Sequence, residues 1–300
     1  MAQAGRSQPE FRQLEAIADG VYVWLQPGGE SGVSNAAVIV DDDGLTVIDT
    51  LMVRSQWEPF AEAVNNLGPP VRRCVLTHPH IDHVGGTKSF PHAAVYGSPY
   101  TSAVLDDEMP VDAYKAFMPA FADEFDDLVE LGTRPVTHEV TGAAQPTPRV
   151  EVLPATGHTD GDLIVLIADA DVCIAGDLCF FDVTPLAFQG DPRQWAEMLD
   201  AINDLADTIV PGHGPVGGEQ KIRELQGYLR ACVAANGEPG AIPAGPWDGW
   251  PERDQRDAIN VERAHLLAHQ RDEMPDAMAR ALGLEPGTPL YGQAGQSRPR

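Results

Sequence analysis

The segment that most constrains the fold of this chain is residues 77–83, which read Thr-His-Pro-His-Ile-Asp-His. It directly follows residues 71–76, a compact apolar run that predicts a buried strand. A strand that leads into polar side chains places them in a loop at its carboxyl end, where α/β proteins often hold their chemistry. We therefore expect an α/β fold with a functional site at one edge of a sheet.

Four side chains of this segment can bind a metal ion: His78, His80, Asp82 and His83. Imidazole and carboxylate groups suit zinc or another first-row divalent ion, and the segment has no cysteine for a thiolate-rich structural zinc site. A loop whose histidines formed only hydrogen bonds would not need four potential ligands at this spacing. The segment therefore predicts a catalytic metal site.

Three further candidate ligands lie downstream, at the ends of β-rich runs: His158, Asp177 and His213. A glycine precedes each of them, and glycine lets the backbone approach a crowded centre without a Cβ clash. Each is expected in a turn that follows a strand. Together with the histidine segment they give seven candidate ligands.

The remaining pattern divides the chain into two halves of similar plan, strands followed by helices. Short β-type runs separated by turn residues predict one antiparallel meander at residues 21–25, 36–40 and 45–48, and a second at 150–153, 163–168 and 172–175. Apolar residues at helical spacing predict helices at residues 57–67, 194–205 and 218–231, with a short strand at 208–210. This alternation indicates layered α/β packing.

Two segments stand outside this plan. Residues 98–133 contain Phe117, Phe121 and Phe125 at i, i+4 and i+8, which predicts one apolar face of a helical insertion. Beyond residue 235, glycine and proline interrupt the chain before a helical pattern at residues 254–270. We therefore expect a catalytic domain at residues 1–234 and a helical appendage with a flexible tail at residues 235–300.

Composition limits the partners and the location. With 20 Lys and Arg against 45 Asp and Glu, the net charge of −25 would repel phosphate backbones and anionic lipids, so neither nucleic acid nor a membrane is an expected partner. We expect a cytoplasmic protein because the N-terminus lacks the apolar core of a signal peptide and no apolar run could span a bilayer. The four cysteines form no CxxC pair and are expected to be buried free thiols.

Over about residues 21–218, the ordered motifs resemble those of the metallo-β-lactamase superfamily. The resemblance implies a four-layer αβ/βα sandwich with two divalent metal ions at one edge, between the two sheets. It implies that His78, His80 and His158 hold the first ion, that Asp82, His83 and His213 hold the second, and that Asp177 bridges them. Asp49, in the first motif of the family, would not bind metal but would steady the histidine segment from outside.

The same resemblance implies a zinc-dependent hydrolase, in which a metal-bound hydroxide cleaves an ester, thioester or lactone-type bond of a small molecule. Asp82 would be both a ligand and a proton acceptor. Asp177 stands where true β-lactamases have cysteine or serine, so the motif pattern is closer to the glyoxalase II and lactonase-like branch. Phe180, however, stands where quorum-quenching lactonases usually have tyrosine. No motif identifies the substrate-binding residues.

Two other activities fit the same residues. A mononuclear iron dioxygenase of this fold, similar to persulfide dioxygenases, would need only His78, His158 and Asp177. A phosphodiesterase of the superfamily would also keep the aspartate. Iron or manganese could therefore replace zinc, and the chain is expected to act as a monomer or as a small homo-oligomer such as a homodimer.

Overall fold

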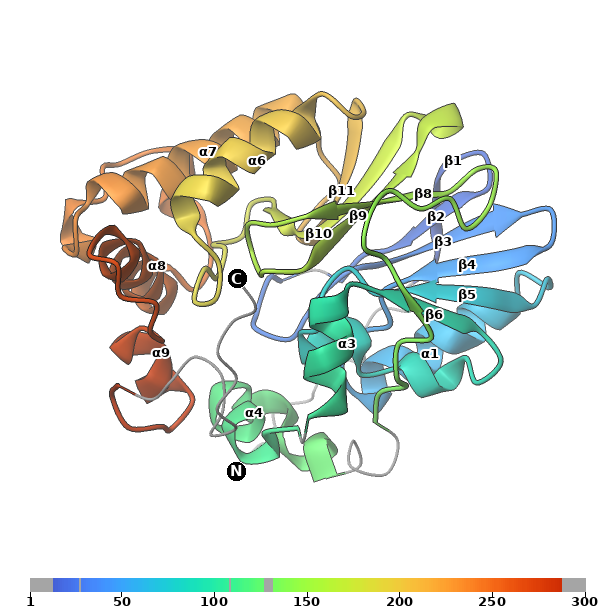
Figure 1. The fold of residues 1–300 in the computed structure, drawn as a ribbon, viewed down its shortest axis with the longest axis horizontal. Helices are drawn as coiled ribbons and strands as arrows, with labels where there is room; N and C mark the ends of the chain where they lie inside the picture. Colours follow the sequence, from blue (N-terminus) through green and yellow to red (C-terminus); the bar gives the residue numbers. More distant parts are fainter. Residues whose placement is uncertain (1–12, 27, 108, 127–131, 288–300) are drawn as a thin grey trace, which may run out of the picture.

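The structure is a computed structural model that describes residues 13–26, 28–107, 109–126 and 132–287 (Figure 1). In this part of the chain, seven strands form the first sheet, in which β1 to β4 are antiparallel and β4 to β7 are parallel. Their bounds, in spatial order, are β1 (Glu15–Ala18), β2 (Val21–Trp24), β3 (Ala36–Asp41), β4 (Gly44–Ile48), β5 (Val71–Val75), β6 (Ala94–Gly97) and β7 (His138–Glu139).

The second sheet has the spatial order β11-β10-β9-β8. Its strands are β8 (Glu151–Ala155), β9 (Asp162–Ile167), β10 (Val172–Phe180) and β11 (Thr208–His213). β8, β9 and β10 form an antiparallel meander, whereas β11 pairs parallel to β10 and is connected to it through a helix. Both expected meanders are therefore present.

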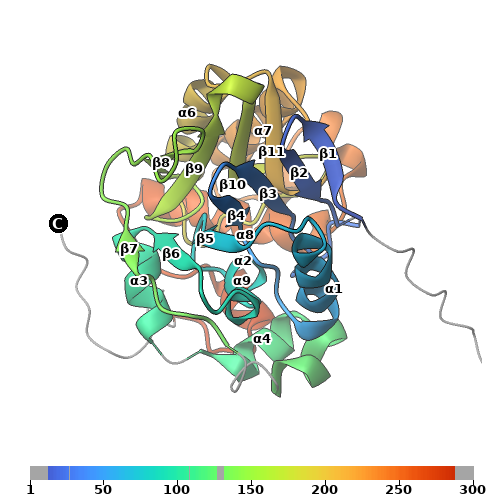
Figure 2. The ribbon, with the colours of Figure 1, turned by 90° about the vertical axis from the view of Figure 1, so that its right-hand side faces the viewer.

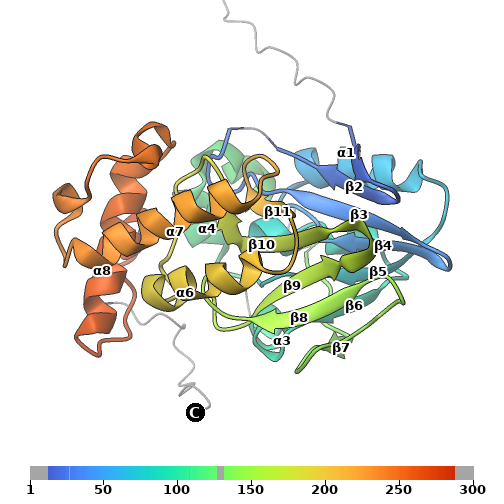
Figure 3. The ribbon, with the colours of Figure 1, turned by 90° about the horizontal axis from the view of Figure 1, so that it is seen from above.

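Helices cover the outer face of each sheet, so the chain forms four layers (Figure 2). The layer on the first sheet contains α1 (Arg54–Asn65), α2 (Ile81–Val84), η1 (Thr87–Ser89) and α3 (Pro99–Asp106). The layer on the second sheet contains α6 (Pro192–Asn203) and α7 (Glu219–Ala234) (Figure 3). A short helix, η3 (Ala168–Ala170), joins β9 to β10. The expected four-layer αβ/βα sandwich is confirmed.

Strand β3 shows why the first sheet is covered on both sides. Ala37 and Ile39 belong to the apolar cluster between the two sheets, whereas Ala36 and Val38 belong to the cluster beneath α1. Successive side chains of a strand point to opposite faces, and here both faces are buried. This explains why the strand reads as a continuous apolar run rather than an alternating one.

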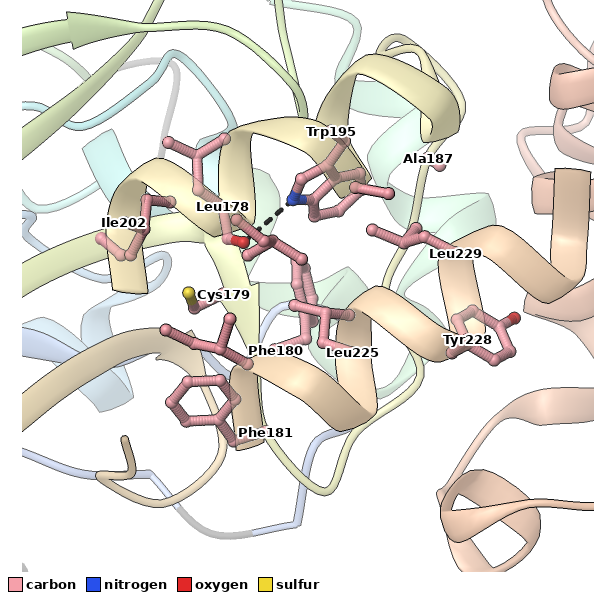
Figure 4. Close-up of a cluster of buried hydrophobic side chains, with 14 of the residues drawn as sticks. Leu178, Cys179, Phe180, Phe181, Ala187, Trp195, Ile202, Leu225, Tyr228 and Leu229 are labelled. Atoms are coloured by element: carbon pink, nitrogen blue, oxygen red, sulfur yellow. Dashed lines mark hydrogen bonds between the residues drawn. The ribbon is translucent and has the colours of Figure 1, made fainter. Parts of the chain in front are cut away.

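Helix α6 is anchored on β10 by Trp195, which is fully buried in the cluster drawn in Figure 4. Its Nε1 donates a 2.9 Å hydrogen bond to the carbonyl oxygen of Leu178. The helix begins at Asp191 and Pro192, a side-chain cap followed by a residue suited to the first turn. The helix layer therefore fixes the carboxyl half of β10.

An insertion and an appendage meet at one end of the sandwich (Figure 1). The insertion contains α4 (Val111–Phe117) and η2 (Pro119–Glu124). The appendage contains η4 (Pro239–Ala241), η5 (Pro246–Gly249), α8 (Arg253–Ala268) and α9 (Asp276–Ala281). Phe117 of α4 packs against the cluster of Ile259, Met274 and Met278, so the two segments are in contact.

Several local predictions were wrong. Phe117, Phe121 and Phe125 do not share one helix, because α4 ends at Phe117 and Met118, which precedes Pro119, leaves the helical conformation. Strand β10 extends to Phe180 rather than to residue 175, and β11 extends to His213 rather than to residue 210. Asp177 and His213 therefore lie in strands and not in turns. Strands β1, β6 and β7 and helix α9 were not predicted. Residues 1–12 and 27 of the expected catalytic domain, 108 and 127–131 of the expected insertion and 288–300 of the expected tail lie outside the described residues.

All four cysteines are buried and free, as expected: Cys74, Cys173, Cys179 and Cys232. Within the described residues, no helix combines the length and the apolar character needed to cross a bilayer.

Candidate metal centre

The seven candidate ligands come from both sheets but lie together at one edge of the sandwich. His78 and His80 follow β5, and Asp82 and His83 lie in the short helix α2 rather than in a loop. The other three come from the turn between β8 and β9 and from the last two strands, namely His158, Asp177 in β10 and His213 at the end of β11.

The first group contains His78, His80, His158 and Asp177, whose ligand atoms all lie within 4.8 Å of one another. Nδ1 of His80 lies 2.9 Å from Nε2 of His158. The Oδ2 atom of Asp177 lies 3.4 Å from Nε2 of His158 and 3.7 Å from Nε2 of His78. These four ligand atoms could hold one metal ion.

The second group contains Asp82, His83 and His213, again with all ligand atoms within 4.8 Å. The Oδ2 atom of Asp82 lies 3.3 Å from Nε2 of His213 and 3.8 Å from Nε2 of His83. Asp177 reaches this group as well, since its oxygens lie 3.0 Å from Nε2 of His83 and 3.4 Å from Nε2 of His213. Asp177 therefore lies between the two groups.

The side chains at this edge fit divalent metal ions. Nε2 of His78, Nε2 of His83 and Oδ1 of Asp177 are buried, and none makes a hydrogen bond within the described part of the chain. Buried polar atoms without a hydrogen-bond partner are costly and rare, and here they point toward one another. Imidazole nitrogens and carboxylate oxygens are the donors that zinc, iron and manganese accept.

Asp49 holds the histidine segment from outside. Its Oδ2 accepts a 2.8 Å hydrogen bond from Nδ1 of His83, and its two oxygens accept hydrogen bonds from the amide and hydroxyl groups of Thr77, at 2.8 and 2.7 Å. The Thr77 hydroxyl in turn lies 3.0 Å from Nδ1 of His78. Because these contacts place the ring protons on Nδ1, the Nε2 lone pairs of both histidines face the centre.

Two of the other three histidines are also held by a carbonyl oxygen, whereas Nδ1 of His158 has no hydrogen-bond partner in the described part of the chain. Nδ1 of His213 donates to the carbonyl oxygen of Val33 at 3.0 Å, and Nε2 of His80 donates to Oε1 of Gln189 at 2.6 Å. Neither contact was predicted from the sequence. No motif surrounds Gln189, and a backbone carbonyl such as that of Val33 leaves no signature in side-chain patterns.

Local electrostatics separate the two groups. Burial, the strongest influence, lowers the pKa of His78 well below its usual value and that of His158 to about 3. Burial opposes the charge of His83 and His213 too, but Asp177 and Asp82 raise the pKa of His83 well above its usual value and that of His213 to about 9. Metal binding at the second group would therefore release protons, because a ligating imidazole must be unprotonated on the binding nitrogen.

Asp162 clamps the turn that carries His158. It is buried, and its oxygens accept hydrogen bonds from the amides of His158 and Thr159 at 3.0 to 3.1 Å and from the Thr159 hydroxyl at 2.5 Å. Burial raises the pKa of Asp162 to about 7, although the Thr159 hydrogen bonds act to lower the pKa. Asp162 was not predicted from the sequence, although its position four residues after His158 and directly after Gly161 could have indicated it.

We expect Asp162→Asn to lower the free energy of unfolding by about 1–3 kcal/mol and to weaken zinc binding. The amide would place an NH₂ group against a backbone N–H donor, which leaves that buried donor without an acceptor. Chemical denaturation and metal content measure the two effects. Asp160→Asn, at an exposed position of the same turn, is the control. Equal losses of stability and zinc binding in both variants would contradict a specific role of Asp162 in holding the turn.

A two-sheet α/β sandwich with clustered histidines and aspartates at one edge defines a class of metal-binding proteins. The sequence profile described as "Metallo-beta-lactamase superfamily" matches residues 29–213. The chain belongs to this superfamily.

The curated relatives include an uncharacterized protein and enzymes with two different names. The chain is 28% identical over 153 residues to an uncharacterized protein, YobT, of Bacillus subtilis, covering 48% of this chain and 60% of that one. It is 25% identical over 232 residues to a linear primary-alkylsulfatase of Pseudomonas sp., covering 64% of this chain but 44% of that one. It is 22% identical to a hydroxyacylglutathione hydrolase of Acaryochloris marina, covering 92% and 98%. The chain thus spans less than two thirds of the first two relatives and nearly all of the third.

Solved structures show the same fold. The metallo-β-lactamase FIM-1 of Pseudomonas aeruginosa, in its mono-zinc form, superposes with a TM-score of 0.57 at 18% identity, covering 77% of this chain and 97% of that one. The DIM-1 metallo-β-lactamase gives a TM-score of 0.58 at 17% identity, covering 75% and 99%.

Proposed function

We propose that this chain is a zinc-dependent hydrolase that uses two metal ions to cleave an ester, thioester or lactone-type bond of a small molecule. The observation that carries the proposal is that Asp177 contacts both ligand groups, within a chain of the metallo-β-lactamase superfamily. Hydroxyacylglutathione hydrolases are among its relatives, and an acyl-glutathione is a thioester. These relatives support a hydrolytic activity.

His78, His80 and His158 would hold the first ion, and Asp82, His83 and His213 the second, with Asp177 shared. When bound, the two ions would lower the pKa of an attacking water molecule toward neutrality and supply positive charge for the developing oxyanion. Asp49 would keep His83 in the tautomer that presents Nε2 to the centre.

Asp82 supplies an ionised carboxylate beside this centre. Burial raises its pKa, but His83 and His213 outweigh burial and hold the pKa at about 2. We propose that Asp82 orients the attacking water molecule and accepts its proton. Asp82→Asn should therefore reduce turnover on the order of a hundredfold or more; turnover at the wild-type rate, with metal content measured in parallel, would show that the assigned role is wrong.

The appendage bears on the choice of substrate. Four of its arginines are each paired with a carboxylate within 4 Å: Arg253 with Asp257, Arg256 with Glu252, Arg263 with Asp272 and Arg271 with Glu273. Arg280 is exposed and has no carboxylate partner within the described residues. Glutathione carries two carboxylates at neutral pH, and binding either one at Arg253, Arg256, Arg263 or Arg271 would require an existing ion pair to be shared or released. Acyl-glutathione is therefore compared directly with uncharged esters, thioesters and lactones.

A substrate panel on zinc-loaded protein tests the proposal. The panel contains a carboxylic ester, a simple thioester, an acyl-glutathione, a lactone, a phosphodiester, an alkyl sulfate and a β-lactam. Cleavage of a phosphodiester or sulfate alone would overturn the bond class. Bound metal is measured in protein purified without added metal, because about one iron ion and no zinc would support an iron dioxygenase instead.

A further inference from the structure

Helix α8 of the appendage contacts a segment beside the metal centre through the side chain of Arg263, which is 1% exposed. Its Nε donates to the carbonyl oxygen of Gly190 at 2.9 Å, and its Nη2 donates to that of Gln189 at 3.0 Å. The other hydrogen bonds of the guanidinium reach the Glu273 carbonyl oxygen and the Asp272 carboxylate, both at 2.9 Å. Arg263 therefore fixes the backbone of residues 189–190.

These two residues contact both sides of the first ligand group. The Gln189 side chain accepts the 2.6 Å hydrogen bond from Nε2 of His80. Gly190 lies so close to the turn that carries His158 that a Cβ atom there would be 1.8 Å from the Gly157 carbonyl oxygen and 2.8 Å from that of His158. A shift of this short segment would therefore disturb two candidate ligands at once.

The contact with Gln189 also decides which nitrogen of His80 can bind metal. With the proton on Nε2 held by the amide oxygen, the lone pair of Nδ1 points toward Nε2 of His158, 2.9 Å away. Phe188, the residue before Gln189, stacks on one face of the His80 ring, with centroids 5.4 Å apart and planes 15° from parallel. The segment that Arg263 holds thus sets both the tautomer and the orientation of this ring.

We infer that Arg263 is a positioning residue for the first metal-binding group, acting through Gln189 on His80 and through Gly190 on the His158 turn. The inference rests on the proposed role of these histidines as metal ligands. Arg263 lies beyond the region of the chain that the family profile matches, which ends at residue 213. The appendage would then be part of the support of the metal centre, not only a cover at the end of the fold.

A simpler role would be that Arg263 only attaches the appendage to the sandwich, and the chain offers a matched control for it. Arg256, on the same helix, is also buried, at 2% exposed. It donates to the Thr184 carbonyl oxygen and, at 3.0 Å, to the Ser31 hydroxyl. Arg256 thus attaches the appendage without any described contact to residues 189–190.

The test is zinc affinity of the full chain, measured by competition with a chromogenic chelator. Arg263→Met and Gln189→Leu should each weaken the binding of one of two zinc ions by about 10- to 100-fold, the usual effect of removing a partner of a ligating histidine. The double variant should lose less than the product of the two single losses, because both act on His80. Arg256→Met should not weaken zinc binding, whatever its effect on stability, because Arg256 has no described contact with residues 189–190 and its positive charge interacts with Asp177 and Asp82.

Wild-type zinc affinity in Arg263→Met would overturn the inference. A loss of zinc affinity in Arg256→Met as large as that in Arg263→Met would also overturn it. So would a loss in the double variant equal to the product of the two single losses. If Arg263→Met does not fold, Arg263→Lys replaces it, since lysine can keep the ion pair with Asp272 but lacks the planar fork that reaches two carbonyl oxygens. Wild-type zinc affinity in Arg263→Lys would then overturn the inference in the same way. A failed hydrolase proposal would look different: normal zinc binding with no turnover.

Discussion

Asp177→Asn is expected to reduce kcat/KM for the best substrate of the panel on the order of a hundred- to a thousandfold. The two oxygens of Asp177 lie 3.0 Å from His83 and 3.4 Å from both His158 and His213, so one side chain serves both ligand groups. Asparagine keeps the shape but loses the charge and one of the two acceptor oxygens. We therefore expect the variant to fold and to retain fewer zinc ions.

Steady-state kinetics and metal analysis of the same preparation measure this effect. Asp200→Asn is the control, because Asp200 is an exposed carboxylate that pairs with Arg223 at the surface. Its kcat/KM and zinc content should match those of the wild type. Two zinc ions bound with wild-type affinity in Asp177→Asn would show that this carboxylate is not shared between them.

Gly212→Ala should have the second-largest effect, a loss of activity on the order of a hundredfold with little change in the substrate range. A Cβ atom at position 212 would lie 1.9 Å from Oδ1 of Asp177 and 2.9 Å from its amide nitrogen. These atoms belong to a buried strand and to a candidate ligand, so they cannot simply rotate away. The added methyl group would therefore displace the carboxylate.

Gly240→Ala provides the control for this substitution, because a Cβ atom at that position would meet nothing within 4 Å. Zinc content and activity are compared in both variants. The explanation fails if Gly212→Ala binds zinc and turns over substrate like the wild type. Strands β10 and β11 could then move apart to admit the methyl group without displacing Asp177.

The sequence predicted the parts of the site that depend on local patterns. His78 to His83 follow a predicted strand, and a glycine precedes His158, Asp177 and His213, so residue type and spacing indicated seven candidates. The resemblance to the superfamily joined them into one site, and the structure brings their ligand atoms together in two groups. The layered fold followed from the two meanders and their helices in the same way. Asp49 could be named only through the resemblance, because a single aspartate after a strand has no distinctive pattern.

Contacts between distant segments were not predictable in this way. Gln189 meets His80 across 109 positions of sequence, and Arg263 meets Gln189 across 74. Neither residue has a local motif, because their positions depend on how the appendage packs on the sandwich. The aromatic spacing at Phe117 and Phe121 favoured a helix, but Pro119 between them stops it.

The ligands of the candidate centre are divided between the two sheets: His78 to His83 follow the first, whereas His158, Asp177 and His213 belong to the second. An ion bound by ligands from both would join the two halves of the sandwich as a cross-link does. Ligand binding to the native state alone adds about 2.7 kcal/mol when free ligand exceeds Kd a hundredfold. The resistance of this chain to unfolding and proteolysis would then vary with the metal supply of its surroundings.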